Sequence, residues 1–271
     1  MLLESVALFL ALESATAGEP RSPSAKWNVN FDDAQCIAHR DYGTSVRPLR
    51  LVLKAPPVGD VMQVAVMQEA SSTPPQQMSA FVAIDGSRPL KTNLLTYTPK
   101  ASKERIYLLN MPSADFASLR QAKTVSVRSE GLNETFALSG MEPLLKVVDE
   151  CVTDLRRVFN IGATGTEPVG LTSRATTNLA KLFSDADYPD VAVMKGQSGK
   201  VRFALLIGED GRVADCTIVA TSGVPSLDSQ ACALLKTRAK FEPARDHEGK
   251  PAKDSVVGGI VWRMAATSRS R

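Results

Sequence analysis

Apolar and polar residues alternate over several short segments in the first half of the chain. In the first of them, Trp27, Val29 and Phe31 alternate with polar residues, and a period of two is typical of a strand with one buried face. Pro-Pro pairs and the turn signal Asp85-Gly86 separate the later segments. The further predicted strands cover residues 49–53, 61–67, 80–84, 124–128 and 134–138.

A helical period follows these strands. Apolar residues from Leu144 to Leu155 recur at helical spacing within residues 142–158, which predicts an amphipathic helix, and a shorter helix is predicted over 114–122. We therefore expect a mostly-β N-terminal unit with a C-terminal helix over residues 26–158. Residues 160–170 are rich in Gly, Thr and Pro and show no period, so we interpret them as a linker.

A second unit is predicted over residues 171–264. Pro189 suits the first turn of a short helix that ends near Gly196. Residues 200–207 and 213–220 predict a hairpin around the turn at Asp210-Gly211. Ser226 is predicted to cap a helix over 227–239, and residues 256–264 predict a closing strand. The expected fold class is α+β, the second unit having a three-stranded antiparallel sheet and two helices.

Short motifs in this second unit follow one another in a characteristic order. They are Tyr188-Pro189, Gly199, Asp210-Gly211-Arg212-Val213, Ser222-Gly223, Leu227-Asp228, Phe241-Glu242-Pro243-Ala244 and Gly249-Lys250-Pro251. No single motif is specific. Their order over residues 171–264 resembles the C-terminal domain of the TonB family, the periplasmic energy transducers of Gram-negative bacteria. The N-terminal unit lies outside this resemblance and stays unassigned.

The resemblance implies that an extended segment of a partner protein adds to an exposed edge of the sheet. We expect the closing strand to receive it, with Gly258 and Gly259 admitting the partner's backbone closely; alternatively, these glycines mark a β-bulge. In the family, residues just before Tyr-Pro also contact a receptor. The predicted partner-binding residues are therefore Val256, Val257, Gly258, Gly259, Ile260, Val261, Trp262, Asp187 and Tyr188.

The family implies a protein partner such as an outer-membrane receptor or another envelope protein. The sequence departs from the family's transducers in residues 185–187, which are Asp, Ala and Asp where transducers tend to have amide residues. A transducer also needs a long Pro-rich span and a membrane helix, and no apolar run here approaches the roughly 20 residues that cross a bilayer. We therefore expect a protein-binding role. Transport energisation is the alternative, and it needs a membrane anchor.

The first 17 residues resemble a secretory signal peptide. Residues 6–12 form a short apolar run, and Ala15-Thr16-Ala17 offers small residues at a cleavage site. This pattern predicts export to the periplasm. An ordinary N-terminal helix is the alternative, because no Lys or Arg precedes the run and Glu4 and Glu13 flank it. At the other end, residues 265–271 predict a small, polar, basic tail.

The four cysteines divide between the two units. In a unit with this order of elements the helix packs across the sheet and brings Cys216 near Cys232, while Cys36 and Cys151 bracket the N-terminal unit. Only this pairing stays within the units, so we predict the disulfides Cys36–Cys151 and Cys216–Cys232, which persist in an oxidising compartment. A metal or redox site is the alternative, but the chain has no C-x-x-C motif.

Composition narrows the chemistry further. A net charge of +3 over 271 residues is too small to indicate nucleic acid as a partner. The chain has only two His, which lie in different units, and no G-x-S-x-G motif. We therefore expect neither catalysis nor a metal or cofactor. An enzyme in the N-terminal unit is the alternative; it would need polar groups that converge in a pocket, which the sequence does not disclose.

Overall fold

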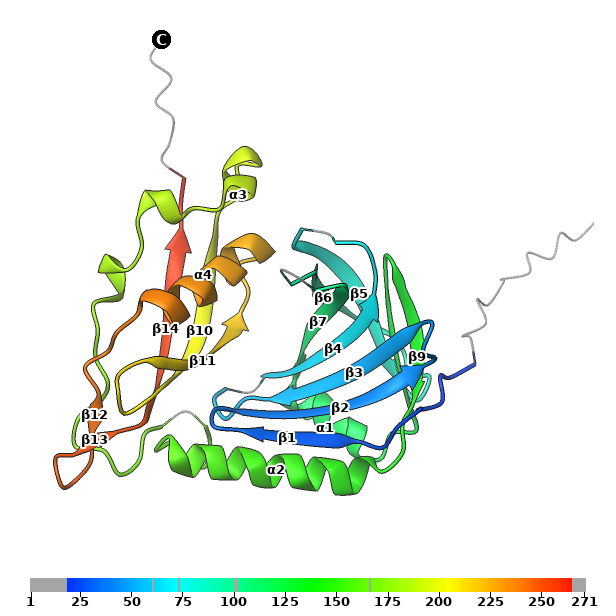
Figure 1. The fold of residues 1–271 in the computed structure, drawn as a ribbon, viewed down its shortest axis with the longest axis horizontal. Coiled ribbons are helices and arrows are strands. Elements are labelled where there is room, and N and C mark those ends of the chain that lie inside the picture. The colour runs from blue at the N-terminus through cyan, green and yellow to red at the C-terminus, as the bar shows by residue number, and fades with distance from the viewer. Residues whose placement is uncertain (1–18, 60, 73, 100–101, 166, 265–271) are drawn as a thin grey trace, which may run out of the picture.

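Antiparallel strand pairing organises the computed structural model, which describes residues 19–59, 61–72, 74–99, 102–165 and 167–264. Within these residues, nine strands form one sheet in the N-terminal unit, three form a second sheet in the C-terminal unit, and two short strands pair separately. Figure 1 shows the two units side by side. The predicted α+β class is confirmed. The predicted signal peptide and C-terminal tail lie outside the described residues.

The N-terminal sheet has the strand order β1-β2-β3-β4-β7-β6-β5-β8-β9. Every neighbouring pair is antiparallel, and the sheet curves strongly (Figure 1). The strands are β1 (Asn28–Asp32), β2 (Gln35–Gly43), β3 (Pro48–Ala55), β4 (Val61–Glu69), β5 (Gln76–Ile84), β6 (Leu90–Tyr97), β7 (Glu104–Pro112), β8 (Thr124–Ser129) and β9 (Leu132–Ala137).

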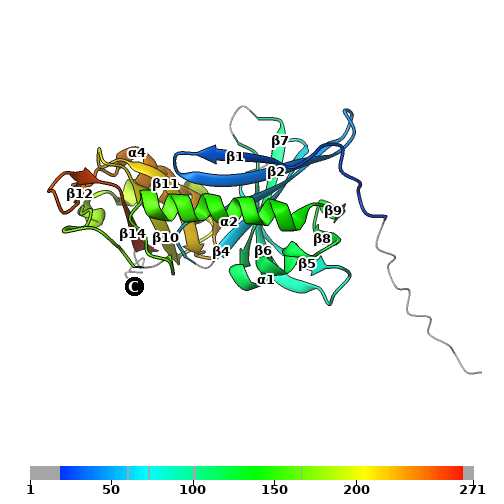
Figure 2. The ribbon, with the colours of Figure 1, turned by 90° about the horizontal axis from the view of Figure 1, so that it is seen from below.

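Helix α2 (Met141–Val158) packs its apolar face against this sheet, and Figures 1 and 2 show it alongside β1 and β2. The disulfide Cys36–Cys151 joins β2 to α2, with Cα atoms 6.0 Å apart. A bond that closes so long a loop stabilises the fold by about 2–5 kcal/mol, mainly by restricting the unfolded chain. The short helix α1 (Ser113–Ala117) continues into the 3-10 turn η1 (Ser118–Arg120). Among the described residues, no helix is both long and apolar enough to cross a membrane.

The sequence pattern did not predict β2, β6 and β7. In β2, the inward positions include the small Ala38 and the charged Arg40, so Tyr42 is the one large aromatic side chain on its buried face. Arg40 is tolerated there because its guanidinium donates to the carbonyl oxygens of Ala25 and Ser139. These are tertiary contacts, which local alternation does not reveal.

The C-terminal sheet has the order β11-β10-β14, and α4 packs across one face of it. The disulfide Cys216–Cys232 joins β11 to α4, with Cα atoms 5.7 Å apart. The elements of this unit are η2 (Leu179–Lys181), η3 (Asp185–Asp187), α3 (Asp190–Met194), β10 (Gly199–Ile207), β11 (Val213–Ala220), α4 (Pro225–Arg238), β12 (Ala244–Arg245), β13 (Pro251–Ala252) and β14 (Asp254–Trp262).

The predicted limits of the helix at 227–239 and of the closing strand at 256–264 are wrong, and this strand ends at Trp262. Helix α4 begins at Pro225, before Ser226, and no side chain caps it; proline suits the first turn because the N–H that it lacks would be unpaired there. The closing strand begins at Asp254, which pairs with Ile207. Its buried carboxylate accepts hydrogen bonds from Arg174, a distant contact that extends the strand beyond its apolar pattern.

The β10 and β11 part of the sheet face opposite α4 is buried against the N-terminal unit. Ala204 and Leu206 of β10 belong to the same hydrophobic core as the N-terminal sheet, and Val219 of β11 packs against that core. Phe203 and Leu205, which alternate with them, form a separate core on the α4 side. The small sheet therefore lies between α4 and the N-terminal unit.

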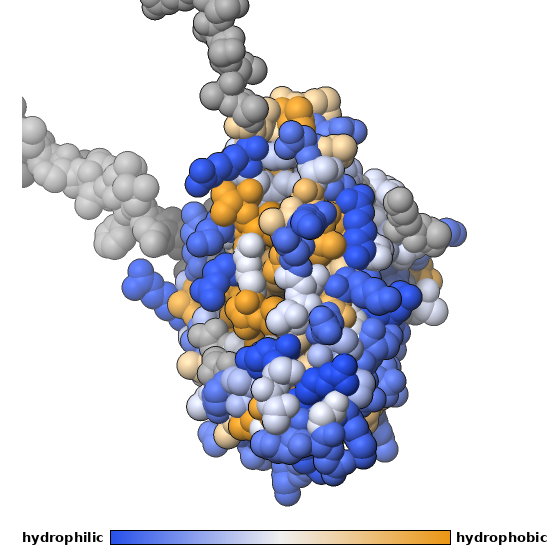
Figure 3. Space-filling view, turned by 90° about the vertical axis from the view of Figure 1, so that its left-hand side faces the viewer, coloured by the Kyte–Doolittle hydropathy of each residue, from blue (hydrophilic) through white to orange (hydrophobic). Residues whose placement is uncertain are grey.

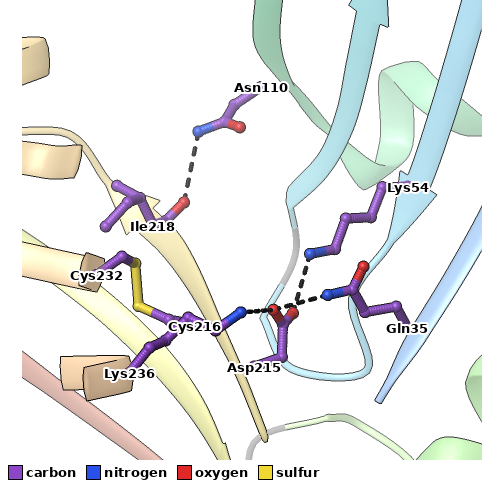
Figure 4. Close-up of a disulfide and its surroundings, with 8 residues drawn as sticks. All are labelled: Gln35, Lys54, Asn110, Asp215, Cys216, Ile218, Cys232 and Lys236. Carbon is purple, nitrogen blue, oxygen red and sulfur yellow. Dashed lines mark hydrogen bonds and ion pairs between the residues drawn. A yellow bond between two sulfur atoms is a disulfide. The ribbon is translucent and has the colours of Figure 1, made fainter. Parts of the chain in front are cut away.

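A buried carboxylate marks the junction of the two units. Asp215 of β11 is 4% exposed. Its Oδ2 lies 2.9 Å from Nζ of Lys54 in β3, and its Oδ1 accepts a hydrogen bond of 3.0 Å from Gln35 in β2, as Figure 4 shows. Nζ of Lys236 in α4 lies 3.6 Å from Oδ1. Groups from both units thus hold this one carboxylate.

The segment predicted as a linker packs against the fold. Ile161 is buried and forms a β-bridge with Pro168. Arg156, at the end of α2, donates hydrogen bonds to the carbonyl oxygens of Pro57 and Ala163. These contacts fix the path of the chain from α2 towards the C-terminal unit.

Breaking the Asp215–Lys54 pair should weaken the fold. Asp215→Asn and Lys54→Met each leave a largely buried charge without its partner, so we expect each to lower the free energy of unfolding by about 1–3 kcal/mol. A double-mutant cycle by urea unfolding should give a coupling energy of about 1–3 kcal/mol. The control is the exposed pair Arg50–Asp41, for which we expect less than about 1 kcal/mol. Equal coupling energies in the two pairs would contradict the prediction that the buried Asp215–Lys54 pair stabilises the fold more than a surface pair.

Candidate partner-binding edge

Strand β14 forms one edge of the C-terminal sheet, because β10 occupies its centre. The pairing of β14 with β10 runs without interruption from Trp262 opposite Gly199 to Asp254 opposite Ile207. The alternative that Gly258 and Gly259 mark a bulge is therefore wrong. The register shifts of this sheet lie between β10 and β11 instead.

Alternate residues of β14 turn their backbone groups away from β10. The carbonyl oxygen of Ser255 accepts a hydrogen bond from Arg174, which lies outside the sheet, and in an antiparallel ladder every second residue turns to the same side. The N–H and C=O groups of Val257, Gly259 and Val261 therefore point outward. Within the described part of the chain, none of these three residues has a backbone partner outside the sheet.

The side chains along this edge are mostly apolar. Val257 and Val261 are 49% and 51% exposed on the face of β14 opposite α4. On the other face, Leu179, Leu182 and Ile260 are partly buried against the core. Figure 3 looks onto this side of the molecule and shows apolar surface gathered among charged residues. An extended apolar segment could contact both faces of the edge.

Packing within the sheet explains why both of these β14 positions are glycine. Phe203 lies opposite Gly258 on β10, and its ring covers Gly258, so a Cβ there would lie 2.8 Å from Cζ of Phe203. A Cβ on Gly259 would lie 3.0 Å from the carbonyl oxygen of Val201. Packing thus accounts for both positions, and the close approach of a partner's backbone stays a prediction.

Arg174 and Asp254 fix the beginning of the edge. The carboxylate of Asp254 is fully buried and accepts hydrogen bonds of 2.8 Å from Nε of Arg174 and from the backbone N–H of Ala175. Because Arg174 also donates to Ser255, the edge is covered at Ser255 and open from Val257 onward.

The predicted binding residues Asp187 and Tyr188 lie near the far end of β14, which Trp262 forms. The buried carboxylate of Asp187 accepts hydrogen bonds from the backbone N–H and hydroxyl of Ser184 and from Arg238. These bonds, the backbone N–H first, lower the pKa of Asp187 below its ordinary value. Tyr188 donates its hydroxyl to a backbone carbonyl, and its ring packs edge-on against the buried Trp262 at 5.4 Å. Only Tyr188 of the three reaches the surface.

The other edge strand, β11, faces the N-terminal unit. Asn110 of β7 approaches the carbonyl oxygen of Ile218 at 3.5 Å, and Figure 4 shows this contact near the Asp215 cluster. The edge of β11 is therefore partly covered, which leaves β14 as the edge open to a partner.

Sequence reasoning missed Arg174 and Leu179. Both lie in a segment without a hydrophobic period, and both act through contacts with residues 254–258, far along the chain. No local signal identifies such contacts.

In the described residues, no group of three or more His, Cys, Asp or Glu is placed to hold a metal ion.

Comparison with known proteins assigns the C-terminal unit. Residues 184–264 match the family described as Gram-negative bacterial TonB protein C-terminal, which confirms the resemblance seen in the sequence. This family is a non-enzymatic protein-interaction domain of the cell envelope. The matched residues include α3, the whole three-stranded sheet and α4. A search of curated proteins found no match.

Hydrogen exchange should alternate along β14. In the isolated protein, the amides of Val257, Gly259 and Val261 should exchange rapidly because they point outward, whereas those of Gly258 and Ile260 should be protected by β10. NMR-detected exchange on the full chain measures this directly. Equal protection of all five amides would show that the outer edge is already paired.

Acid should remove the stabilisation that Asp187 supplies. Because its folded-state pKa is lowered, this stabilisation is present above the ordinary value of about 3.9 and is lost as the pH falls towards the folded-state pKa. In urea unfolding, the stability difference between wild type and Asp187→Asn should be present near neutral pH and shrink below about pH 4. Ser184→Ala keeps the backbone N–H and should retain most of this pH dependence. A difference between wild type and Asp187→Asn that stays constant with pH would contradict the assignment.

Proposed function

Starting from a C-terminal unit of the TonB type, we propose that this protein binds an extended segment of a partner protein by strand addition to β14. The open backbone groups of Val257, Gly259 and Val261 carry the proposal, because they form a row of unsatisfied donors and acceptors at a regular edge. The partner is an envelope protein, such as an outer-membrane receptor.

Backbone pairing gives affinity with little demand on the partner's sequence, and the flanking side chains add selectivity. Side chains of an added strand alternate between the two faces of the sheet. Those on one face would contact Val257 and Val261, and those on the other would contact Leu179 and Ile260. The edge therefore favours a segment with apolar residues on both faces.

The periplasm is the proposed place of action. Two disulfides, one in each unit, join sheet to helix, and such bonds persist in oxidising compartments and are rare in the cytosol. The matched family supports the same location. The N-terminal unit packs against β10 and β11 on one face of the C-terminal sheet, and we propose that it thereby holds β14 in a fixed position for the partner.

A proline at Val261 tests strand addition. Val261→Pro removes one outward N–H but leaves the N–H of Ile260 to bond β10, and edge strands tolerate proline whose ring replaces a solvent-facing N–H. A photoreactive phenylalanine analogue at Val257 reports partner binding by cross-linking in native envelope. We expect the yield of the Val257 adduct to fall at least about tenfold, the effect of losing about 1.4 kcal/mol of binding free energy.

Val261→Thr is the matched control, because it keeps the N–H and the branched shape, and its adduct yield should stay near that of wild type. The same analogue at the exposed Val46 of the N-terminal unit should not give the adduct. An unchanged yield in a Val261→Pro protein that melts like wild type would rule out pairing at this edge.

A further inference from the structure

Strands β6 and β7 separate partway along the N-terminal sheet. They pair only from Leu94 opposite Leu109 to Tyr97 opposite Ile106. Beyond this point β6 continues beside β5, and β7 continues beside β4 as far as Pro112. The sheet therefore has a wedge-shaped opening between residues 90–93 and 110–112.

An apolar cavity of about 580 Å³ lies in this opening. Val82, Leu109 and Met111 form its inner wall, and Leu90, 56% exposed, lies at its mouth. The same three inner residues also line a small cavity of about 10 Å³ deeper in the core, so apolar surface continues inward from the opening. The larger volume falls within the range of small-molecule sites, roughly 300–1,000 Å³.

The surface changes from apolar to amide-rich on the outer side of the opening. A second cavity of about 220 Å³ there is lined by Gln63, Gln77, Asn93 and Asn110, which come from four neighbouring strands. Asn110 and Thr92 line both cavities, so the two cavities are neighbours at the opening. The opposite wall of the outer cavity comes from β11 and the start of α4.

In the described part of the chain, no cationic side chain lines the outer cavity. Its one charged lining residue, Asp228, accepts hydrogen bonds from the backbone N–H of Ser222 and the hydroxyl of Thr221. Oε1 of Gln77 is buried and has no hydrogen-bond partner among the described residues. Because amides both donate and accept, this wall suits a ligand group that is polar, uncharged and able to donate.

The charged residues around the larger, apolar cavity do not favour the binding of an anion. Lys91 lies there together with Asp85 and Asp115 of α1, and Figure 2 shows α1 beside β5 and β6. A fatty-acid carboxylate would thus meet no net positive charge at this rim. The charge pattern favours a neutral head group.

We propose that the opening between β6 and β7 binds an amphiphile with an alkyl or acyl chain and an uncharged, hydroxyl-bearing head group. The chain lies against Leu90, Leu109 and Met111, and the head group lies against the amides of Gln77 and Asn93. This site is separate from the β14 edge, so it holds whether or not β14 binds a partner strand.

Isothermal titration of the full chain with octyl, decyl and dodecyl glucoside, each below its micelle-forming concentration, tests the proposal. Affinity should rise about fourfold for each added methylene, since burying a methylene contributes about 0.8 kcal/mol. Glucose alone lacks the chain and decanoate lacks the neutral head, so both should bind at least about tenfold more weakly than decyl glucoside.

Two variants locate the site. Leu90→Asn puts a polar group at the mouth of the apolar cavity and should weaken decyl glucoside binding at least about fivefold, whereas Val158→Asn, an exposed change on α2, should not alter it. Gln77→Leu should reduce the preference for decyl glucoside over decanoate. Thermal melting confirms that each variant is folded. Affinity independent of chain length, equal binding of decanoate, or an unchanged affinity in Leu90→Asn would overturn the proposal.

Discussion

Packing on both faces of the three-stranded sheet is the constraint on which the C-terminal unit depends. A sheet of three strands needs an apolar face that packs against other elements. Here α4 covers one face, and the N-terminal sheet covers the β10 and β11 part of the other. The N-terminal unit also covers part of the β11 edge, and its Lys54 pairs with the buried carboxylate of Asp215. Of the two edges of this sheet, β14 is therefore the one left open for a partner.

The sequence predicted the C-terminal unit better than the N-terminal one, for a physical reason. Residues 200–220 form a hairpin whose alternation and turn are local, and β11 was predicted with its observed limits, Val213–Ala220. The N-terminal sheet depends on strands such as β2, whose inward positions include Ala38 and Arg40. Arg40 is tolerated there because it donates hydrogen bonds to the distant backbone carbonyls of Ala25 and Ser139, which a local pattern does not contain.

The candidate edge shows the same limit. The apolar character of residues 256–262 identified the strand. However, Gly258 leaves room for the ring of Phe203 and Trp262 packs inside the unit, and the outward row begins only at Val257. Which residues face outward follows from the bond between Arg174 and Ser255. The opening between β6 and β7 was equally hidden, because it arises where two strands that the sequence pattern did not predict stop pairing with each other.

The uninterrupted ladder between β14 and β10 also has a mechanical consequence. A partner strand pulled along its own length would load that ladder in shear, so that its hydrogen bonds would have to yield together and not one after another. Behind β10, the β11 layer is tied covalently to α4 through Cys216–Cys232, which limits how far the sheet can deform. Tension from a partner would therefore be spread over the whole length of β14.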